Sequence, residues 1–136
     1  MSDRPGIPLP RPTPLSRPHW DGCRDGVLRY QRCRDCDTAV FVPQPVCPGC
    51  FGDGLAWVAS SGRGAVYSFT VVHRPQRPAF EVPYVVVIAE LEEGWSMLSN
   101  LVDCDPADVR VGLPIEVVFR AMSEEITLPY FRPRRG

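Results

Sequence analysis

The 136-residue sequence predicts a mostly β protein, in which a short N-terminal helix and a rubredoxin-like zinc ribbon precede a small β-barrel. Two Cys-x-x-Cys pairs that lie close together in the first half of the chain predict the ribbon. After residue 55, short segments rich in Val, Ile, Phe and Tyr are separated by Gly, Pro and acidic turns, which is the pattern of short strands. Five or six such strands with one small helical insertion favour a Greek-key barrel of the OB type.

The first part of the chain, residues 1–15, contains five prolines and predicts an extended arm that is either a solvated tail or a segment lying along a partner. A short helix is expected next, with Ser16 as its cap and Gly26 as its end. Within it, Trp20 and Cys23 are three residues apart and therefore share a face. We expect that pair to pack into the protein core.

The metal site is predicted by the spacing C-x2-C-x10-C-x2-C, which names Cys33, Cys36, Cys47 and Cys50 as ligands. Two tight turns of this kind close a tetrahedron of thiolates around zinc. A redox dithiol normally occurs once, between a strand and a helix, whereas this motif occurs twice in a loop-rich segment. An iron–sulfur cluster is the other alternative. Four thiolates leave no open position, so the zinc is expected to be structural rather than catalytic.

The remaining chain, residues 55–136, is assigned to the barrel and its tail, and residues 16–54 to the helix and ribbon. Asp105–Val109 predicts a single helical turn, with Asp105 as cap and Pro106 at the first position. Cys104, like Cys23, lies outside the metal spacing and is interpreted as a buried small apolar residue. The predicted strands are Leu55–Ala59, Ala65–His73, Tyr84–Leu91, Ser96–Leu101, Pro114–Phe119 and Ile126–Phe131.

Composition limits the function classes. The net charge is −1, and from residue 60 onward eight Arg face ten Asp plus Glu, which disfavours a strong electrostatic grip on nucleic acid. No apolar run approaches the roughly 20 residues that span a bilayer, and the N-terminus lacks the apolar core of a secretory signal. We therefore expect no membrane association and a cytoplasmic location.

No catalytic constellation is recognisable. The two histidines, His19 and His73, have no neighbouring Cys or Ser in a nucleophile context. The pairs Glu92-Glu93 and Glu124-Glu125 are predicted to be solvated turn charges. The loop Ser61–Gly64 could offer backbone N–H groups and the Arg63 side chain to a phosphate, although a glycine pair before a strand is usually a turn.

These features together resemble a known family, the zinc-ribbon/OB-fold proteins of domain of unknown function 35, which are associated with acyl-CoA metabolism. The resemblance covers about residues 16–133, and Asp37 departs from the glycine that usually follows the first knuckle. Its most specific motifs are Cys33-Arg34-Asp35-Cys36, Cys47-Pro48-Gly49-Cys50 and Ser61-Gly62-Arg63-Gly64-Ala65-Val66-Tyr67-Ser68-Phe69-Thr70.

The resemblance implies a non-catalytic accessory subunit of a hetero-oligomer. Its implied partner is a thiolase-like or sterol-carrier-type aldolase subunit, in a retro-aldol step of steroid side-chain degradation. A MaoC-like enoyl-CoA hydratase is the alternative partner, and single-stranded nucleic-acid binding is an alternative function. The expected contacts with the CoA moiety are Gly62, Arg63, Gly64, Arg74 and Arg77.

The C-terminal tail adds a prediction of its own. It carries apolar side chains with little domain left to cover them, which is typical of partner-binding segments. We therefore expect Tyr130, Phe131 and Arg132 to face the partner.

Overall fold

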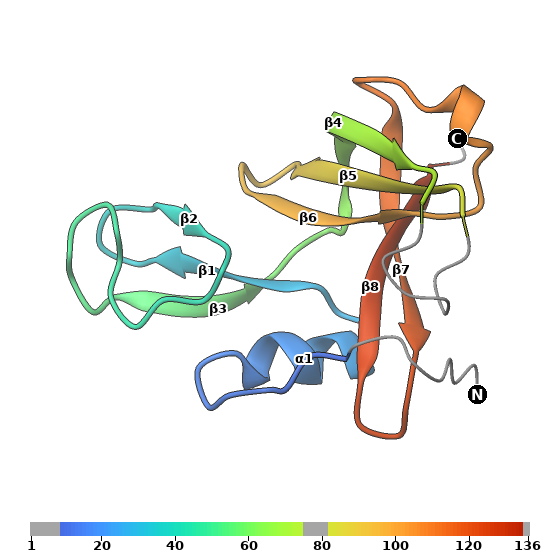
Figure 1. Cartoon of the computed structure of the whole chain (residues 1–136). Coiled ribbons are helices and arrows are strands. Elements are labelled where there is room, and N and C mark those ends of the chain that lie inside the picture. Colours follow the sequence, from blue (N-terminus) through green and yellow to red (C-terminus); the bar gives the residue numbers. More distant parts are fainter. Residues whose placement is uncertain (1–8, 75–81, 135–136) are drawn as a thin grey trace.

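The computed structural model describes residues 9–74 and 82–134 and confirms the mostly β fold class (Figure 1). One helix and a small three-stranded sheet form the N-terminal part, and five strands close into a barrel. No helix within these two ranges has the length and apolar character needed to span a bilayer. The predicted arm falls partly outside the described residues.

The N-terminal part contains the helix α1 (Arg17–Arg24) and a sheet in the order β2-β1-β3. The strands of that sheet are β1 (Arg29–Cys33), β2 (Ala39–Val40) and β3 (Leu55–Ala59). The barrel runs in the order β4-β5-β6-β8-β7. Its elements are β4 (Arg63–Val72), β5 (Tyr84–Leu91), β6 (Ser96–Leu101), the 3-10 turn η1 (Pro106–Asp108), β7 (Pro114–Ala121) and β8 (Thr127–Pro133).

Strand β3 belongs to the ribbon, not to the barrel as the sequence analysis assigned it. Its five residues pair antiparallel with β1, from Arg29 opposite Ala59 to Cys33 opposite Leu55. This pairing places the exit of the second cysteine pair beside the entry of the first. The barrel therefore begins at Arg63, after the short linker of Ser60–Gly62.

Helix α1 ends as predicted but begins differently. Gly26 adopts φ +79° directly after it, a left-handed conformation that glycine adopts at low cost. At the start, Ser16 has helical φ/ψ, so its side chain does not cap the helix. Thr13 takes that role, because its Oγ1 accepts from Ser16 N at 3.1 Å and its carbonyl accepts from Arg17 N at 2.8 Å. The prediction of Ser16 as cap was therefore wrong by one turn.

The second predicted cap is confirmed. The Asp105 carboxylate accepts a hydrogen bond from Ala107 N at 2.9 Å and holds η1, with Pro106 at its first position. An Asp side chain and a proline suffice here because both act locally, within one turn.

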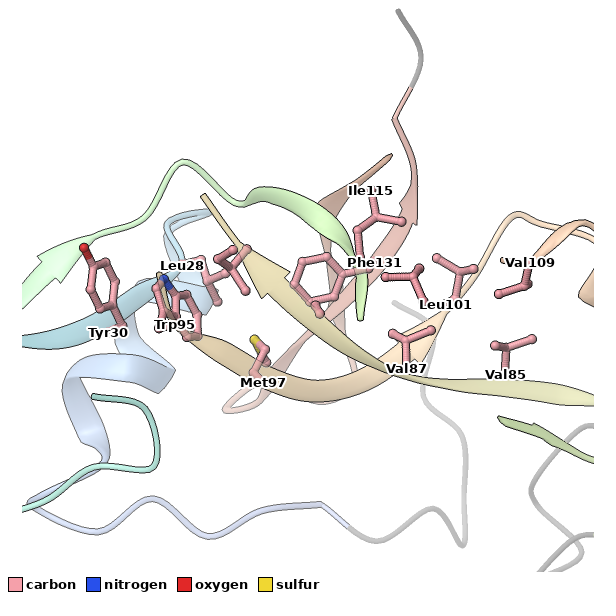
Figure 2. Packing of buried hydrophobic residues seen from close by; sticks show 13 residues of the cluster. Leu28, Tyr30, Val85, Val87, Trp95, Met97, Leu101, Val109, Ile115 and Phe131 are labelled. Carbon is pink, nitrogen blue, oxygen red and sulfur yellow. The ribbon is translucent and has the colours of Figure 1, made fainter. Parts of the chain in front are cut away.

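The barrel interior is filled by alternate residues of its strands, as the period of two requires. On β5, Val85, Val87, Ala89 and Leu91 are buried, and the residues between them are more exposed. Figure 2 shows Phe131 of β8 in the middle of this cluster beside Ile115. Because the Phe131 side chain is fully buried, it does not form part of an exposed partner surface, in contrast to the sequence expectation.

Ribbon and barrel share one hydrophobic cluster. The indole of Trp95, at the start of the β5–β6 hairpin's return, stacks on Tyr30 of β1 with ring centroids 5.0 Å apart. The Phe41 ring lies 4.9 Å from the same indole on another side. Figure 2 shows Tyr30 and Trp95 together at one end of the barrel core. The two units are therefore joined by aromatic packing as well as by the chain.

His19 of α1 is buried in the part of the structure that faces this junction, which the sequence analysis did not foresee. Its Nδ1 lies 3.3 Å from the carbonyl oxygen of Arg29, and its ring packs against Phe41 at 5.1 Å. Burial lowers the pKa of His19, although the Arg29 carbonyl acts in the opposite direction. The neutral ring is therefore the form that the folded protein accommodates. Cys23 is buried beside it, as predicted, whereas Trp20 is only half buried.

A pH-dependent loss of stability should follow from this burial. The unfolded chain takes up a proton at His19 near its ordinary pKa of 6.5, and the folded chain does so only at lower pH. The free energy of unfolding should therefore fall as the pH drops below 6.5, by up to about 1.4 kcal/mol per pH unit from this group. Denaturant unfolding between pH 7.5 and 5.5 measures the slope, which His19→Phe should reduce. His73→Gln, at an exposed histidine, should keep the wild-type slope; an unchanged slope in His19→Phe would contradict the assignment.

Candidate functional site

The four predicted metal ligands meet at the tip of the ribbon, and their Sγ atoms all lie within 4.8 Å of one another. Cys33 Sγ is 3.7 Å from Cys50 Sγ, and Cys36 Sγ is 3.6 Å from Cys47 Sγ. A tetrahedron with Zn–S bonds of about 2.3 Å has edges of about 3.8 Å, whereas a disulfide bond is about 2.05 Å long. The donor set therefore fits a four-coordinate zinc ion.

Each cysteine pair lies on a turn of the same geometry. Asp37 N donates to Cys33 O at 2.9 Å, and Phe51 N donates to Cys47 O at 2.8 Å. Both donor residues are left-handed, with φ of +64° and +59°. The glycine that Asp37 replaces would adopt this conformation without strain, which explains the family preference at that position. The second turn also directs Gly49 N at the Cys47 sulfur, at 3.3 Å.

The thiols are held in an arrangement that requires a cation. Hydrogen bonds from Thr38, whose hydroxyl lies 2.9 Å from Cys36 Sγ, lower the pKa of Cys36 to about 6. A hydrogen bond from Gly52 lowers the pKa of Cys50, but the neighbouring thiols raise it to about 12 in total. Four thiolates at this spacing repel one another, and a divalent ion removes that repulsion. With all four positions taken, zinc would hold the ribbon together and activate no water.

The loop at residues 61–64 is built for packing and for an internal carboxylate. Gly62 is left-handed at φ +74°, and a Cβ there would collide with the Val117 side chain. A Cβ on Gly64 would collide with the Glu90 carbonyl oxygen. The N–H groups of Ser61, Gly62 and Arg63 already donate to Glu93 Oε2, Ser60 Oγ and Ser61 Oγ. These three N–H groups are therefore not available to a phosphate, against the sequence expectation.

Glu93 is the centre of this network and not the solvated turn charge that the sequence analysis expected. Its Oε1 accepts from Ser60 Oγ at 2.7 Å and from the Trp95 indole N–H at 3.2 Å. Its carbonyl oxygen accepts from the Arg32 guanidinium at 2.9 Å. Partial burial would raise the pKa of Glu93, but hydrogen bonds from Ser61, Ser60 and Trp95 lower it below its ordinary value. One ionised carboxylate thus ties the linker, the hairpin and Trp95 together.

Replacing that carboxylate should cost stability at neutral pH. Glu93→Gln keeps the shape but loses the charge, so we expect the free energy of unfolding to fall by about 1–3 kcal/mol at pH 7. The difference from wild type should shrink as the pH falls below 4.5, because the carboxylate is then protonated in both states. Urea unfolding at pH 7 and pH 4 measures both effects. Glu124→Gln in an exposed turn is the matched control, and equal stabilities of the two variants would contradict the role of Glu93.

The predicted CoA-binding residues do not converge on one place. Arg63 opens β4 and lies 3.8 Å from Glu92, a carboxylate that Arg134 also approaches, at 3.6 Å. Arg74 is exposed beyond the far end of β4, so roughly 30 Å of extended strand separates it from Arg63. Arg77 lies outside the described residues. The guanidinium groups of Arg63 and Arg74 remain the cationic candidates.

The predicted partner residues on β8 point to different surroundings, because the strand alternates. Tyr130 is half buried, with the Arg120 guanidinium 5.5 Å from its ring centroid. Arg132 is exposed and pairs with Glu116 at 3.0 Å. Phe131 between them fills the core. Only the outward pair remains for a partner surface.

A ribbon closed by four thiols, followed by a five-stranded barrel with one helical turn, defines a zinc-ribbon/OB-fold protein. Residues 20–56 match the model of the ChsH2 rubredoxin-like zinc ribbon domain, and residues 57–120 match the ChsH2 C-terminal OB-fold domain. The chain belongs to the DUF35 family. The boundary between the two matched regions falls inside β3, although the structure keeps this strand in the ribbon sheet.

A solved structure and curated proteins support this assignment. The chain is similar to one chain of the structure named "Ltp2-ChsH2(DUF35) aldolase", with a TM-score of 0.84, 37% identity and coverage of 92% of this chain and 98% of that one. It is also 40% identical to the "DUF35 domain-containing scaffold protein" of Methanocaldococcus jannaschii, over 69% of this chain and 68% of that protein.

Two bacterial relatives are subunits of hydratases. The "Probable enoyl-CoA hydratase alpha subunit" of Thermomonospora curvata is 40% identical over 84% of this chain and 36% of its own length. The "3-oxo-4,17-pregnadiene-20-carboxyl-CoA hydratase alpha subunit" of Mycobacterium tuberculosis is 40% identical over 74% and 32%. The chain thus spans about a third of the length of these two proteins.

Proposed function

We propose that this chain is a non-catalytic subunit of a hetero-oligomeric acyl-CoA enzyme and that its partner is a thiolase-like aldolase subunit. The similarity to the Ltp2-ChsH2(DUF35) aldolase chain carries the proposal, because it extends over 98% of that chain at a TM-score of 0.84. The name of the M. tuberculosis relative supports a steroid acyl-CoA as the substrate class. In this arrangement the partner supplies the catalytic groups, and the DUF35 subunit supports them.

The chemistry of the described side chains supports an accessory role. The Cys23 thiol lies 3.8 Å from His19 Nε2, which resembles a nucleophile and its base. Burial, however, raises the pKa of Cys23 to about 12, so the thiol is protonated at neutral pH and inert. The four other paired cysteines fill a structural metal site. If CoA touches this subunit, the exposed guanidinium groups of Arg63 and Arg74 are the groups that would attract its phosphates.

A hydratase is the second candidate, since two relatives carry that name. This chain matches about a third of each of them, so the remaining two thirds of such an alpha subunit would have to come from a separate MaoC-like protein. Single-stranded nucleic-acid binding has less support, because the barrel half of the chain is slightly acidic.

Affinity purification of the tagged chain from its native host, with mass spectrometry of the co-purified proteins, tests the proposal. We expect a stoichiometric thiolase-like subunit, and retro-aldol cleavage of a β-hydroxyacyl-CoA by the complex but not by this chain alone. Recovery of a MaoC-like protein instead would favour the second candidate. Recovery of the chain alone, or with nucleic acid, would overturn both.

A further inference from the structure

We propose that a groove between α1, the loop at Phe41–Pro43 and strands β6 and β8 docks an extended, uncharged apolar segment of the partner subunit. The inference rests on the proposed function and assigns the surface through which the chain would bind its partner. The groove has a volume of about 360 Å³, and its walls come from the helix, the ribbon and the barrel. Figure 1 shows α1 lying beside β8, which forms one of these walls.

The lining of the groove determines the chemistry of its occupant. Trp20, Phe41, Leu98, Leu128 and Tyr130 contribute most of the apolar surface, and no Asp, Glu, Lys or Arg lines it. His19 is the one lining histidine, and the buried ring is neutral at pH 7 because burial lowers its pKa. A charged segment would lose its hydration there without gaining an ionic partner. The occupant is therefore an uncharged apolar segment.

The backbone of the groove determines the shape of the occupant. Four consecutive residues of β6 (97–100) and three of β8 (128–130) line it. Since neighbouring side chains on a strand point to opposite faces, consecutive lining residues mean that the strand edges themselves border the groove. Within the described residues, β6 pairs with β8 only between Leu101 and Phe131. Beyond that pair the seam is held by Ser99 Oγ, which donates to the Pro129 carbonyl oxygen at 2.7 Å. An extended segment can add to such an open strand edge.

Two apolar side chains at the rim are exposed in a way that isolated folding does not explain. Leu98 is 67% exposed on β6, and Val42 is 64% exposed on the ribbon loop. Val42 also has φ +72°, a left-handed conformation that is a genuine outlier for a β-branched residue. A valine that is both strained and exposed gains from burial by a partner, whereas glycine would suit the free protein better. The strain and the exposure coincide at the groove.

The test compares Leu98→Arg with Val111→Arg, because Val111 is equally exposed (66%) but does not line the groove. Immobilised wild-type and variant chains are titrated with the purified thiolase-like subunit. We expect Leu98→Arg to weaken binding about 100-fold, and Val111→Arg to change it by less than about twofold. Val42→Gly should weaken binding about tenfold while the melting temperature of the isolated chain stays the same or rises. Equal binding by the two Arg variants would overturn the groove assignment.

The outcomes separate this inference from the proposed function and from other occupants. If the wild-type chain binds no thiolase-like subunit, the proposed function fails. If it binds and Leu98→Arg binds equally well, only the groove assignment fails. Deletion of residues 1–8 that lowers the melting temperature as much as Leu98→Arg would make the chain's own arm the occupant. An isolated wild-type dimer that Leu98→Arg converts to a monomer in light scattering would make the occupant a second copy. Either result would overturn the proposal.

Discussion

Cys47→Ser should remove the zinc and unfold the ribbon. Cys47 is fully buried, and its sulfur faces Cys36 Sγ at 3.6 Å and accepts the Gly49 N–H. Structural zinc sites contribute apparent binding free energies of about 10–16 kcal/mol, which in small ribbons is folding free energy. We expect about one zinc ion per wild-type chain and well under half an ion in the variant, measured by plasma mass spectrometry. Circular dichroism should show loss of the ribbon strands and a lower melting temperature.

Cys104→Ser provides the matched control for this prediction. Cys104 is partly exposed, lies outside the metal cluster and donates to the Asp105 carbonyl oxygen at 3.5 Å. That variant should keep the full zinc content and the wild-type melting temperature. A Cys47→Ser protein with one tightly held zinc and unchanged stability would rule out the four-cysteine site.

Trp95→Ala should lower the free energy of unfolding by about 3–5 kcal/mol, the range for deleting a buried aromatic side chain. The indole is buried, stacks on Tyr30 and packs against Phe41, and its N–H donates to Glu93. Its removal leaves a cavity between the two units and an incompletely bonded carboxylate. Denaturant unfolding should then show two transitions, because the ribbon no longer unfolds together with the barrel.

The zinc content distinguishes this variant from Cys47→Ser, since Trp95→Ala should still hold one metal ion per chain. Trp95→Phe keeps the aromatic contacts and should recover more than half of the lost stability. A single transition with a loss below about 1 kcal/mol in Trp95→Ala would show that ribbon and barrel are not coupled through this residue.

This coupling has a consequence for partner binding. The groove takes Phe41 and Val42 from the ribbon and Leu98 and Tyr130 from the barrel, so its shape depends on how the two units are held together. Trp95 and Glu93 hold them at the junction. We therefore expect variants at either residue to weaken partner binding without touching the partner, an effect carried by geometry and not by contact.

Much of the fold could be predicted from local patterns. The spacing of four cysteines named the metal ligands, and the bounds of Tyr84–Leu91 and Ser96–Leu101 were correct. The turn at Asp105 and the helix end at Gly26 were also predicted correctly. Each of these depends on residues within a few positions of one another, where side-chain chemistry and backbone conformation are directly linked.

What failed depended on contacts between distant residues. Phe131 lies on an alternating strand of the tail, and only closure of the barrel decides that its side chain points inward. Leu55–Ala59 has the composition of any strand, and only its pairing with Arg29–Cys33 places it in the ribbon. Glu93 in a Glu-Glu turn gave no sign of its role, because its partners Ser60, Ser61 and Arg32 lie more than thirty residues away.

The sequence by itself therefore determined the class of protein, the metal ligands and most strands, because short-range spacing specifies them. The tertiary structure alone decided which glutamate is a structural anchor, which tail residues are core, and where an apolar groove opens. The physical reason is that burial and hydrogen-bond partners are properties of packed surfaces. In this chain those surfaces form only when the ribbon packs onto the closed barrel around Trp95.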